Sequence, residues 1–206
     1  MRYLTIIFVF SAVSLWGQSA DSLVEIQIVN DSLKTFANSP ELTIPLRCKN
    51  NGNKNLIMYG FNSNLLTAYV DRLCGNLEKI GGGIGVLIFN AKHERVYAMH
   101  TIPDSIDYKP IPKERFEQLM GYNRMRYLAG TKILKALDIS YVDKKFNLRE
   151  FSLKKGTYQL QLIVFAGKSL VTKGVGIEQI EKDKKEYNAE LYQGCAISNQ
   201  ITFRVD

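Results

Sequence analysis

Cysteine, histidine and tryptophan are scarce in this sequence. Its 206 residues include three cysteines, two histidines and one tryptophan. Cys48, Cys74 and Cys195 match no metal-ligand spacing, and His93 and His100 are too few to complete a zinc site with them. We therefore expect no bound metal.

Motifs for hydrolysis and nucleotide binding are also missing. The chain has no Gly-x-Ser-x-Gly and no His-Glu-x-x-His. Gly167-Lys-Ser169 follows an apolar strand, but Leu162 stands where a phosphate loop needs its first glycine, and later glycines argue against a following helix. The cluster Gly81–Gly85 precedes a strand, whereas a dinucleotide fingerprint follows one, so we interpret it as a turn or bulged strand start. We expect a protein that is not an enzyme and binds no cofactor.

Long apolar runs are absent except at the N-terminus. Arg2 is followed by the apolar run Leu4–Trp16, which is too short to span a bilayer, and then by small residues to Ala20. This pattern predicts a Sec-type signal peptide at residues 1–19, with cleavage after Gly17 or Ala20 as alternatives. No cysteine lies nearby, so we do not expect a lipoprotein. The sequence thus predicts an exported protein, periplasmic or extracellular, with no transmembrane segment in the mature chain.

The net charge is +7 and falls to +6 when Arg2 is removed with the signal peptide. In an exported protein such a charge favours an anionic glycan, lipid head groups or an acidic partner over nucleic acid. Solubility alone also explains it. Residues 20–206 have the length and composition of a single domain.

Alternating apolar and polar residues predict that most of the chain forms β-strands. We expect them at residues 23–29, 42–48, 56–61, 85–89, 95–100, 132–141, 158–165 and 200–205. The Asn51-Gly52 turn predicts a hairpin between the second and third strands, and Pro45 places the second at an edge or a bulge. Residues 90–94 predict another hairpin.

The middle segment, residues 62–130, departs from this pattern. It is expected to carry the hairpin around residues 90–94 and one short helix at Pro112–Met120, and residues 178–190 to form a solvated helix or loop. A mixture of basic and aromatic residues predicts a candidate binding surface for a glycan or an acidic chain, formed by Tyr122, Arg124, Arg126 and Tyr127. The alternative is an ordinary strand with outward charges.

The clearest local pattern lies at residues 151–162. Leu153, then Gly156 in a turn, then Tyr158 opening an apolar strand resembles a tyrosine corner, a device of Greek-key sandwiches. With Pro45–Gly52 and Gly194–Val205 as further core strands, the chain resembles secreted immunoglobulin-like or fibronectin-III-like β-sandwiches of Bacteroidetes-type bacteria. It is more distantly similar to BsuPI-type proteinase inhibitor domains. The expected fold is an all-β, antiparallel, immunoglobulin-like β-sandwich with an elaborated middle segment.

The cysteines do not follow the antibody pattern, which needs a cysteine two residues after Tyr158, where Leu160 stands. Alternation with its neighbours turns Cys48 into the core as a free thiol. Cys74 and Cys195 lie near expected strand ends and are the better candidates for a disulfide.

Three short segments match an Asp-Ser-aliphatic pattern that resembles the acceptor of Bacteroidetes periplasmic O-glycosylation. Their serines are Ser22, Ser32 and Ser105. We treat them as candidate glycosylation sites, provided that the serines are exposed.

These features favour an exported, non-catalytic binding or assembly module of the bacterial cell envelope, whose partner is an envelope protein or an anionic glycan. Sandwiches of this kind bind through loops or by strand addition at a free sheet edge. The alternative is a proteinase inhibitor that presents Thr101–Pro112, suggested by the inhibitor resemblance. A third hypothesis is a hydrolase in which His93 or His100 meets a serine or cysteine. The oligomeric state is left open.

Overall fold

The structure is a computed structural model that describes residues 23–35, 41–61, 64–65, 82–97 and 113–206. The strands are β1 (Val24–Ile28), β2 (Ser32–Thr35), β3 (Glu41–Asn50), β4 (Asn55–Met58), β5 (Asn64–Leu65), β6 (Gly82–Phe89), β7 (Arg95–Val96), β8 (Lys132–Leu134), β9 (Ile139–Asn147), β10 (Gly156–Ala166), β11 (Ala189–Leu191), β12 (Gly194–Ile197) and β13 (Ile201–Val205). The helices are α2 (Lys113–Ala129), α3 (Lys168–Val175) and α4 (Ile177–Glu186), with a short 3₁₀ helix at Arg149–Phe151.

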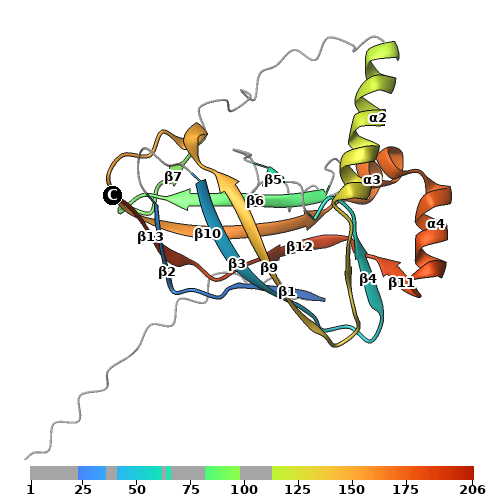
Figure 1. Ribbon diagram of the computed structural model, residues 1–206, viewed down its shortest axis with the longest axis horizontal. Coiled ribbons are helices and arrows are strands. Elements are labelled where there is room, and N and C mark those ends of the chain that lie inside the picture. Colours follow the sequence, from blue (N-terminus) through green and yellow to red (C-terminus); the bar gives the residue numbers. More distant parts are fainter. Residues whose placement is uncertain (1–22, 36–40, 62–63, 66–81, 98–112) are drawn as a thin grey trace, which may run out of the picture.

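Two sheets face each other across the main core (Figure 1). One has the order β1-β3-β9, and the other has the order β2-β13-β10-β6-β5, with β12 also on β10 and β7 on β6. These orders match strands A-B-E and G-F-C of the immunoglobulin fold. The structure therefore confirms the predicted immunoglobulin-like β-sandwich.

The core between the sheets arises from the predicted alternation. In β3 every second residue is buried, and β13 alternates in the same way. The main core contains, among others, Ile28, Ile44, Leu46, Ile84, Ile88, Phe146 and Phe203. Cys48 lies in it as a free thiol, as the alternation predicted.

The expected hairpin between residues 42–48 and 56–61 is wrong. Strand β4 pairs with β8 and with β11 in a third sheet and makes no ladder with β3. The reason is that both faces of β4 are buried: Leu56 and Met58 pack in the main core, while Ile57 packs in a second core under the helices. Pairing with β3 would not bury both faces.

The expectation that Pro45 marks an edge or a bulge is also wrong, because β3 is the central strand of its sheet. The proline nitrogen faces the β1 side, where β1 has already ended at Ile28. The carbonyl of Pro45 accepts a hydrogen bond from the Val29 N–H at 3.0 Å. No donor is needed there, so the proline is tolerated in a central strand.

Two further expectations are resolved by the structure. The hairpin around residues 90–94 is confirmed, with Ile88 opposite Val96 in β6 and β7. A helix does follow Gly167, because α3 begins at Lys168, which corrects the expectation drawn from the later glycines. The last glycines of that segment lie inside α3 and at its end, at Gly174 and Gly176.

The helices gather at one end of the sandwich, and the C-terminus lies at the other (Figure 1). Helix α2 is longer than the short helix expected, and it includes residues 124–127, which excludes a strand there. Beneath the helices lies the second core, formed by Ile57, Tyr59, Tyr127, Val171, Val175, Ile180 and Ala189. The Tyr59 hydroxyl donates to the Asp183 carboxylate at 2.6 Å, which ties α4 to the end of β4.

The tyrosine-corner segment has a specific geometry. The Tyr158 hydroxyl donates to the Lys154 carbonyl at 2.9 Å, across the turn at Gly156, where φ is +156°. Leu153 and Tyr158 are both half-buried against the main core. A hydroxyl that returns to the backbone a few residues upstream is the defining contact of a tyrosine corner.

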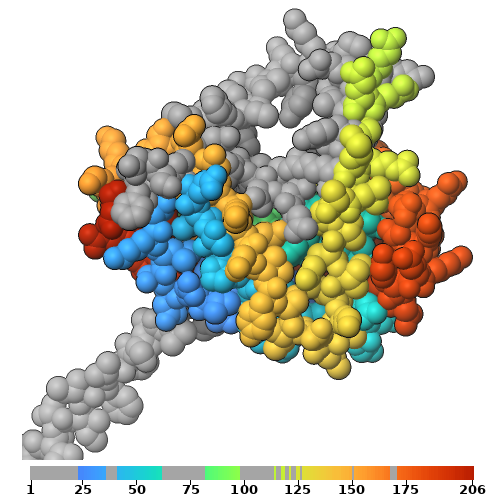
Figure 2. All heavy atoms as spheres, in the orientation of Figure 1, coloured from blue at the N-terminus to red at the C-terminus, as the bar shows by residue number. Residues whose placement is uncertain are grey.

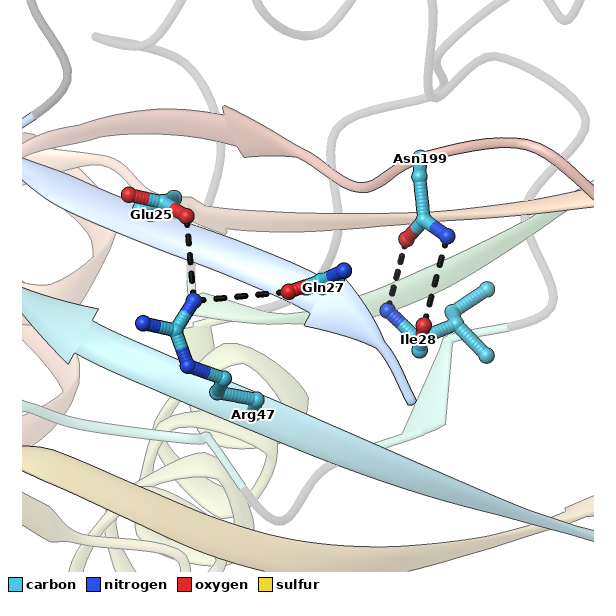
Figure 3. A network of polar contacts seen from close by, with 5 residues as sticks. All are labelled: Glu25, Gln27, Ile28, Arg47 and Asn199. Carbon is cyan, nitrogen blue, oxygen red and sulfur yellow. Dashed lines mark hydrogen bonds and ion pairs between the residues drawn. The ribbon is translucent and has the colours of Figure 1, made fainter. Parts of the chain in front are cut away.

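The chain crosses from one sheet to the other between β1 and β2, and Asn199 fastens this crossing (Figure 3). Its amide oxygen accepts from the Ile28 N–H at 2.7 Å, and its amide nitrogen donates to the Ile28 carbonyl at 3.2 Å. The side chain thus replaces a neighbouring strand at the outer edge of β1.

Replacing Asn199 with alanine is expected to lower the free energy of unfolding by about 2 kcal/mol, since both backbone groups of buried Ile28 lose their partner. Urea denaturation measures this loss. Gln27→Ala is the matched control: it removes only a solvent-side contact with Arg47 and should cost under about 0.5 kcal/mol. Equal losses in the two variants would contradict the role given to Asn199.

Candidate protein-binding edge

Strand β9 ends its sheet, and its pairing register decides which backbone groups face outward. It pairs with β3 from Glu41↔Asn147 to Lys49↔Ile139. The Asn50 N–H donates to the Asp138 carbonyl at 3.1 Å, so the even-numbered residues of β9 turn their N–H and C=O groups toward β3. The odd-numbered residues turn theirs away from it.

The side chains of β9 alternate between the interior and the outer face of the sheet. Val142, Lys144 and Phe146 point between the sheets. The odd-numbered residues point to the outer face, where two of them expose large apolar side chains: Ile139 is 40% exposed and Tyr141 is 69% exposed. The edge thus combines outward backbone groups with apolar side chains, which is the combination that strand addition uses.

Leu137, two residues before β9, extends this apolar row. Its side chain is 70% exposed, and its backbone has φ = +56°, in the left-handed region that a bulky residue rarely adopts. Its N–H donates to the Gly52 carbonyl at 3.1 Å, which holds the turn. A strained backbone that presents an exposed leucine is expected where the side chain serves an interaction.

The other long edge, β1, is closed at Ile28 by Asn199 (Figure 3). Among the described residues, the remaining edge strands are short: β2 has four residues, including the exposed Lys34, and β8 and β11 have three each. Short strands and edge lysines are common protections against strand addition. Strand β9 carries charged residues as well, with Lys145 on its outer face and Lys144 inside. In the part of the chain that the structure describes, β9 is nonetheless the longest edge strand.

A side-chain cap marks the start of the β9 edge. The Asp138 carboxylate accepts from the N–H of Ile139 at 2.8 Å. The outward groups that follow, on Tyr141 and Asp143, have no partner among the described residues. The β8–β9 segment lies on the near face in Figure 2, in yellow and orange beside α2.

Behind this edge, Lys144 places an amine in the interior. The residue is 5% exposed, its Nζ donates to the Phe61 carbonyl at 2.9 Å, and it lies 4.5 Å from the centroid of the Phe61 ring. Burial, opposed by Cys48 and assisted by the Lys132 charge, lowers the pKa of Lys144 to about 8. Burial also raises the pKa of the Cys48 thiol to about 11, so the thiol is protonated at neutral pH.

A polar groove of about 640 Å³ lies between the third sheet and α4. Its lining consists of Asn53, Lys54, Asn55, Ala136, Glu181, Lys184, Lys185, Asn188, Ala189 and Glu190. Two of its lysines are paired with carboxylates, Lys54 with Glu190 and Lys184 with Glu181. The groove is consequently a weak candidate for an anionic ligand.

The candidate surface at residues 122–127 is not assembled as predicted. Tyr127 is buried in the second core, because the helix turns it toward β4, and only Arg124 is seen to be exposed. The side chains of Tyr122 and Arg126 lie outside the described residues. The correction is that Tyr127 contributes to packing and leaves no aromatic–basic surface that includes it.

Several other predicted sites fall partly outside the described residues. Cys195 is disulfide-bonded, while Cys74 lies outside them, so the predicted pairing stays a prediction. Ser32 is exposed on β2, as a glycosylation site requires, but Ser22 and Ser105 also lie outside. His93 is exposed in the hairpin turn.

The inhibitor loop Thr101–Pro112 and His100 likewise lie outside the described residues. Within the described ranges, no three His, Cys, Asp or Glu side chains are grouped to hold a metal ion. No helix in those ranges has both the length and the apolar character needed to cross a membrane.

Sequence reasoning missed Leu137, Ile139 and Tyr141. Their spacing of two was visible as a signal, but it predicts a buried face rather than an exposed edge. Which face of β9 is buried depends on the register of the strand, which is set by Phe146 farther along it.

Comparison with known proteins adds little to this geometry. No family model matches the chain, and no curated protein matches it. Among solved structures, the chain is similar to the ASH/PapD-like domain of human CEP192 (PapD-like domain 7), with 10% sequence identity and a TM-score of 0.32. That alignment covers 98% of this chain and 96% of the other.

Proposed function

We propose that this protein is an exported binding and assembly module of the bacterial cell envelope, and that its partner adds a β-strand to the edge of β9. The observation that carries the proposal is the open edge itself, with Tyr141 and Asp143 directing backbone groups outward beside an exposed apolar row. The location in the envelope is supported by the signal-peptide pattern of residues 1–19.

Strand addition supplies affinity and specificity from different atoms. The outward N–H and C=O groups of β9 form the ladder with any extended segment, whatever its sequence. Leu137, Ile139 and Tyr141 then favour a partner segment whose side chains on the same outer face cover these apolar groups. The partner is therefore a protein in extended conformation, not a glycan or a nucleic acid.

Photo-crosslinking in intact cells tests this proposal. A benzophenone-bearing phenylalanine analogue replaces Tyr141, and the same residue replaces Glu94, which is exposed on the β6–β7 turn of the other sheet. We expect a discrete crosslinked protein band from position 141 and none from position 94. Identical patterns from both positions would contradict a partner at the β9 edge.

A further inference from the structure

We infer that the strand added to β9 is the β9 strand of a second copy of this chain, which pairs antiparallel across a twofold axis at Val142. This inference rests on the proposed function and names the partner at the same edge. It follows from the number of open edges, from the register of the outward groups and from the position of the Asp138 cap.

The number of open edges limits what self-assembly can build. A filament needs two different open edges on each chain, so that pairing can continue from copy to copy. In the described part of the chain, β1 has five residues, its end at Ile28 is bound by Asn199 and β12 lies beside it, whereas β9 has nine residues and stays open. Two copies that pair through β9 use both open edges, and assembly stops at a dimer.

The register follows from which backbone groups are available. Antiparallel pairing about Val142 sets Tyr141 opposite Asp143 of the second copy, and Asp143 opposite its Tyr141. Both are odd-numbered, so their outward groups exchange four hydrogen bonds across the axis without disturbing the ladder with β3. Neither N–H has a partner among the described residues.

The Asp138 cap fits this register. In the register about Val142, Ile139 lies opposite Lys145 of the second copy, outside the four central hydrogen bonds, and its N–H is already bound by the Asp138 carboxylate at 2.8 Å. A register about Ser140 would need that N–H and would have to displace the carboxylate. The cap therefore marks the point where the intermolecular ladder ends.

Side chains on the outer face are compatible with the same register. The two Tyr141 rings become diagonal neighbours across the axis, a distance that aromatic side chains span. Each Asp143 faces a tyrosine rather than directly facing the Asp143 of the other copy, so no like charges are directly opposed. The exposed Tyr141 rings are thereby covered by one another.

Sedimentation velocity of the purified mature chain tests the inference. We expect a dimer at micromolar concentration. Asp143→Pro should raise the dimer dissociation constant by about tenfold or more, because each dimer loses two hydrogen bonds, one from each chain. The proline removes an outward N–H only, so the ladder with β3 is kept. Asp143→Asn keeps that N–H and should dimerise like the wild type.

A second substitution provides an independent test in case the proline variant misfolds. Tyr141→Lys places two like charges near the axis on an exposed position and should also weaken the dimer. Far-UV circular dichroism verifies the fold of each variant. A wild-type chain that stays monomeric, or a dimer that all these substitutions leave unchanged, would overturn the inference.

Disulfide trapping tests the axis directly, in a Cys48→Ala background that removes the free buried thiol. Val142→Cys should form a disulfide-linked dimer on mild oxidation, because the two Val142 Cα atoms would lie about 4.5 Å apart. Ser140→Cys is the control, since its two copies would be separated by about 13 Å along the strands. Crosslinking of Ser140→Cys but not of Val142→Cys would overturn the register.

Failure of this inference is distinguishable from failure of the proposed function. A monomeric chain whose position 141 still crosslinks to a different envelope protein overturns the second copy as partner and leaves strand addition standing. A monomeric chain with no specific crosslink at position 141 overturns both.

Discussion

Replacing Gly82 with alanine is expected to lower the free energy of unfolding by about 3 kcal/mol, and to reduce the yield of folded protein. A Cβ atom on Gly82 would overlap the carbonyl oxygen of Tyr59. That carbonyl cannot easily move away, because Tyr59 is buried and its hydroxyl is bound to Asp183. The contact is reciprocal: a Cβ on Gly60, where φ is +73°, would lie 2.7 Å from the Gly82 carbonyl oxygen.

Urea denaturation followed by circular dichroism measures the loss. Gly121→Ala is the control, because Gly121 lies in α2 and a Cβ atom there would meet no heavy atom within 4 Å, so alanine should raise stability by up to about 1 kcal/mol. A Gly82→Ala variant that loses less than about 1 kcal/mol would show that β4 and β6 can separate at this point.

Gly82 also shows what sequence reasoning can and cannot explain. The pattern of the cluster Gly81–Gly85 predicts a turn or a bulged strand start before a strand, but residues 82–85 lie inside β6 and pair with β10 in an unbroken register. Glycine is required at position 82 because another segment, Tyr59–Gly60, passes too close for a side chain. Contacts between residues far apart in sequence leave no local pattern.

Strands whose two faces differ are predictable from sequence alone. Alternation locates β1, β3 and β13, and the pattern around Tyr158 indicates a sandwich without any knowledge of strand pairing. The neighbour predicted for β4 is wrong, because Leu56, Ile57 and Met58 are all buried, and a continuous apolar run does not say which strands lie beside it.

The candidate site is hidden in the sequence by the register of β9. Ile139 and Tyr141 are the apolar residues at its start, and alternation would turn them inward. Phe146, 1% exposed, lies on the other face and fixes the register, so Lys144 is carried into the interior and Tyr141 to the surface. A shift of one residue exchanges the two faces of a strand, and one large aromatic residue decides between them here.

Burial of Lys144 leads to the last prediction: relative to Lys144→Met, the wild type should gain stability as the pH rises from about 8 to about 10.5. The folded pKa is lowered to about 8, from 10.5 for an exposed lysine. Between these values the unfolded chain binds more protons than the folded one, so the free energy of unfolding increases with pH. Below pH 8 both states are protonated, and the full cost of burying the ammonium is present.

The gain over this range should be at most about 3 kcal/mol, since one pKa unit corresponds to about 1.4 kcal/mol. It is measured as the difference between the two unfolding free energies, from urea titrations at several pH values. Taking the difference matters because Cys48 acts in the opposite direction: its raised pKa of about 11 removes stability above pH 9 in both proteins.

Lys145→Met provides the matched control, because it is the next residue on β9 and its side chain is exposed on the outer face. Its pH profile should follow that of the wild type. If Lys144→Met also followed the wild-type profile, the ammonium would be stabilised by groups that offset its burial, and Phe61 would not be the contact that defines its environment. A profile that flattens only for Lys144→Met would establish that the register of β9 forces a charged residue into the core beside the proposed edge.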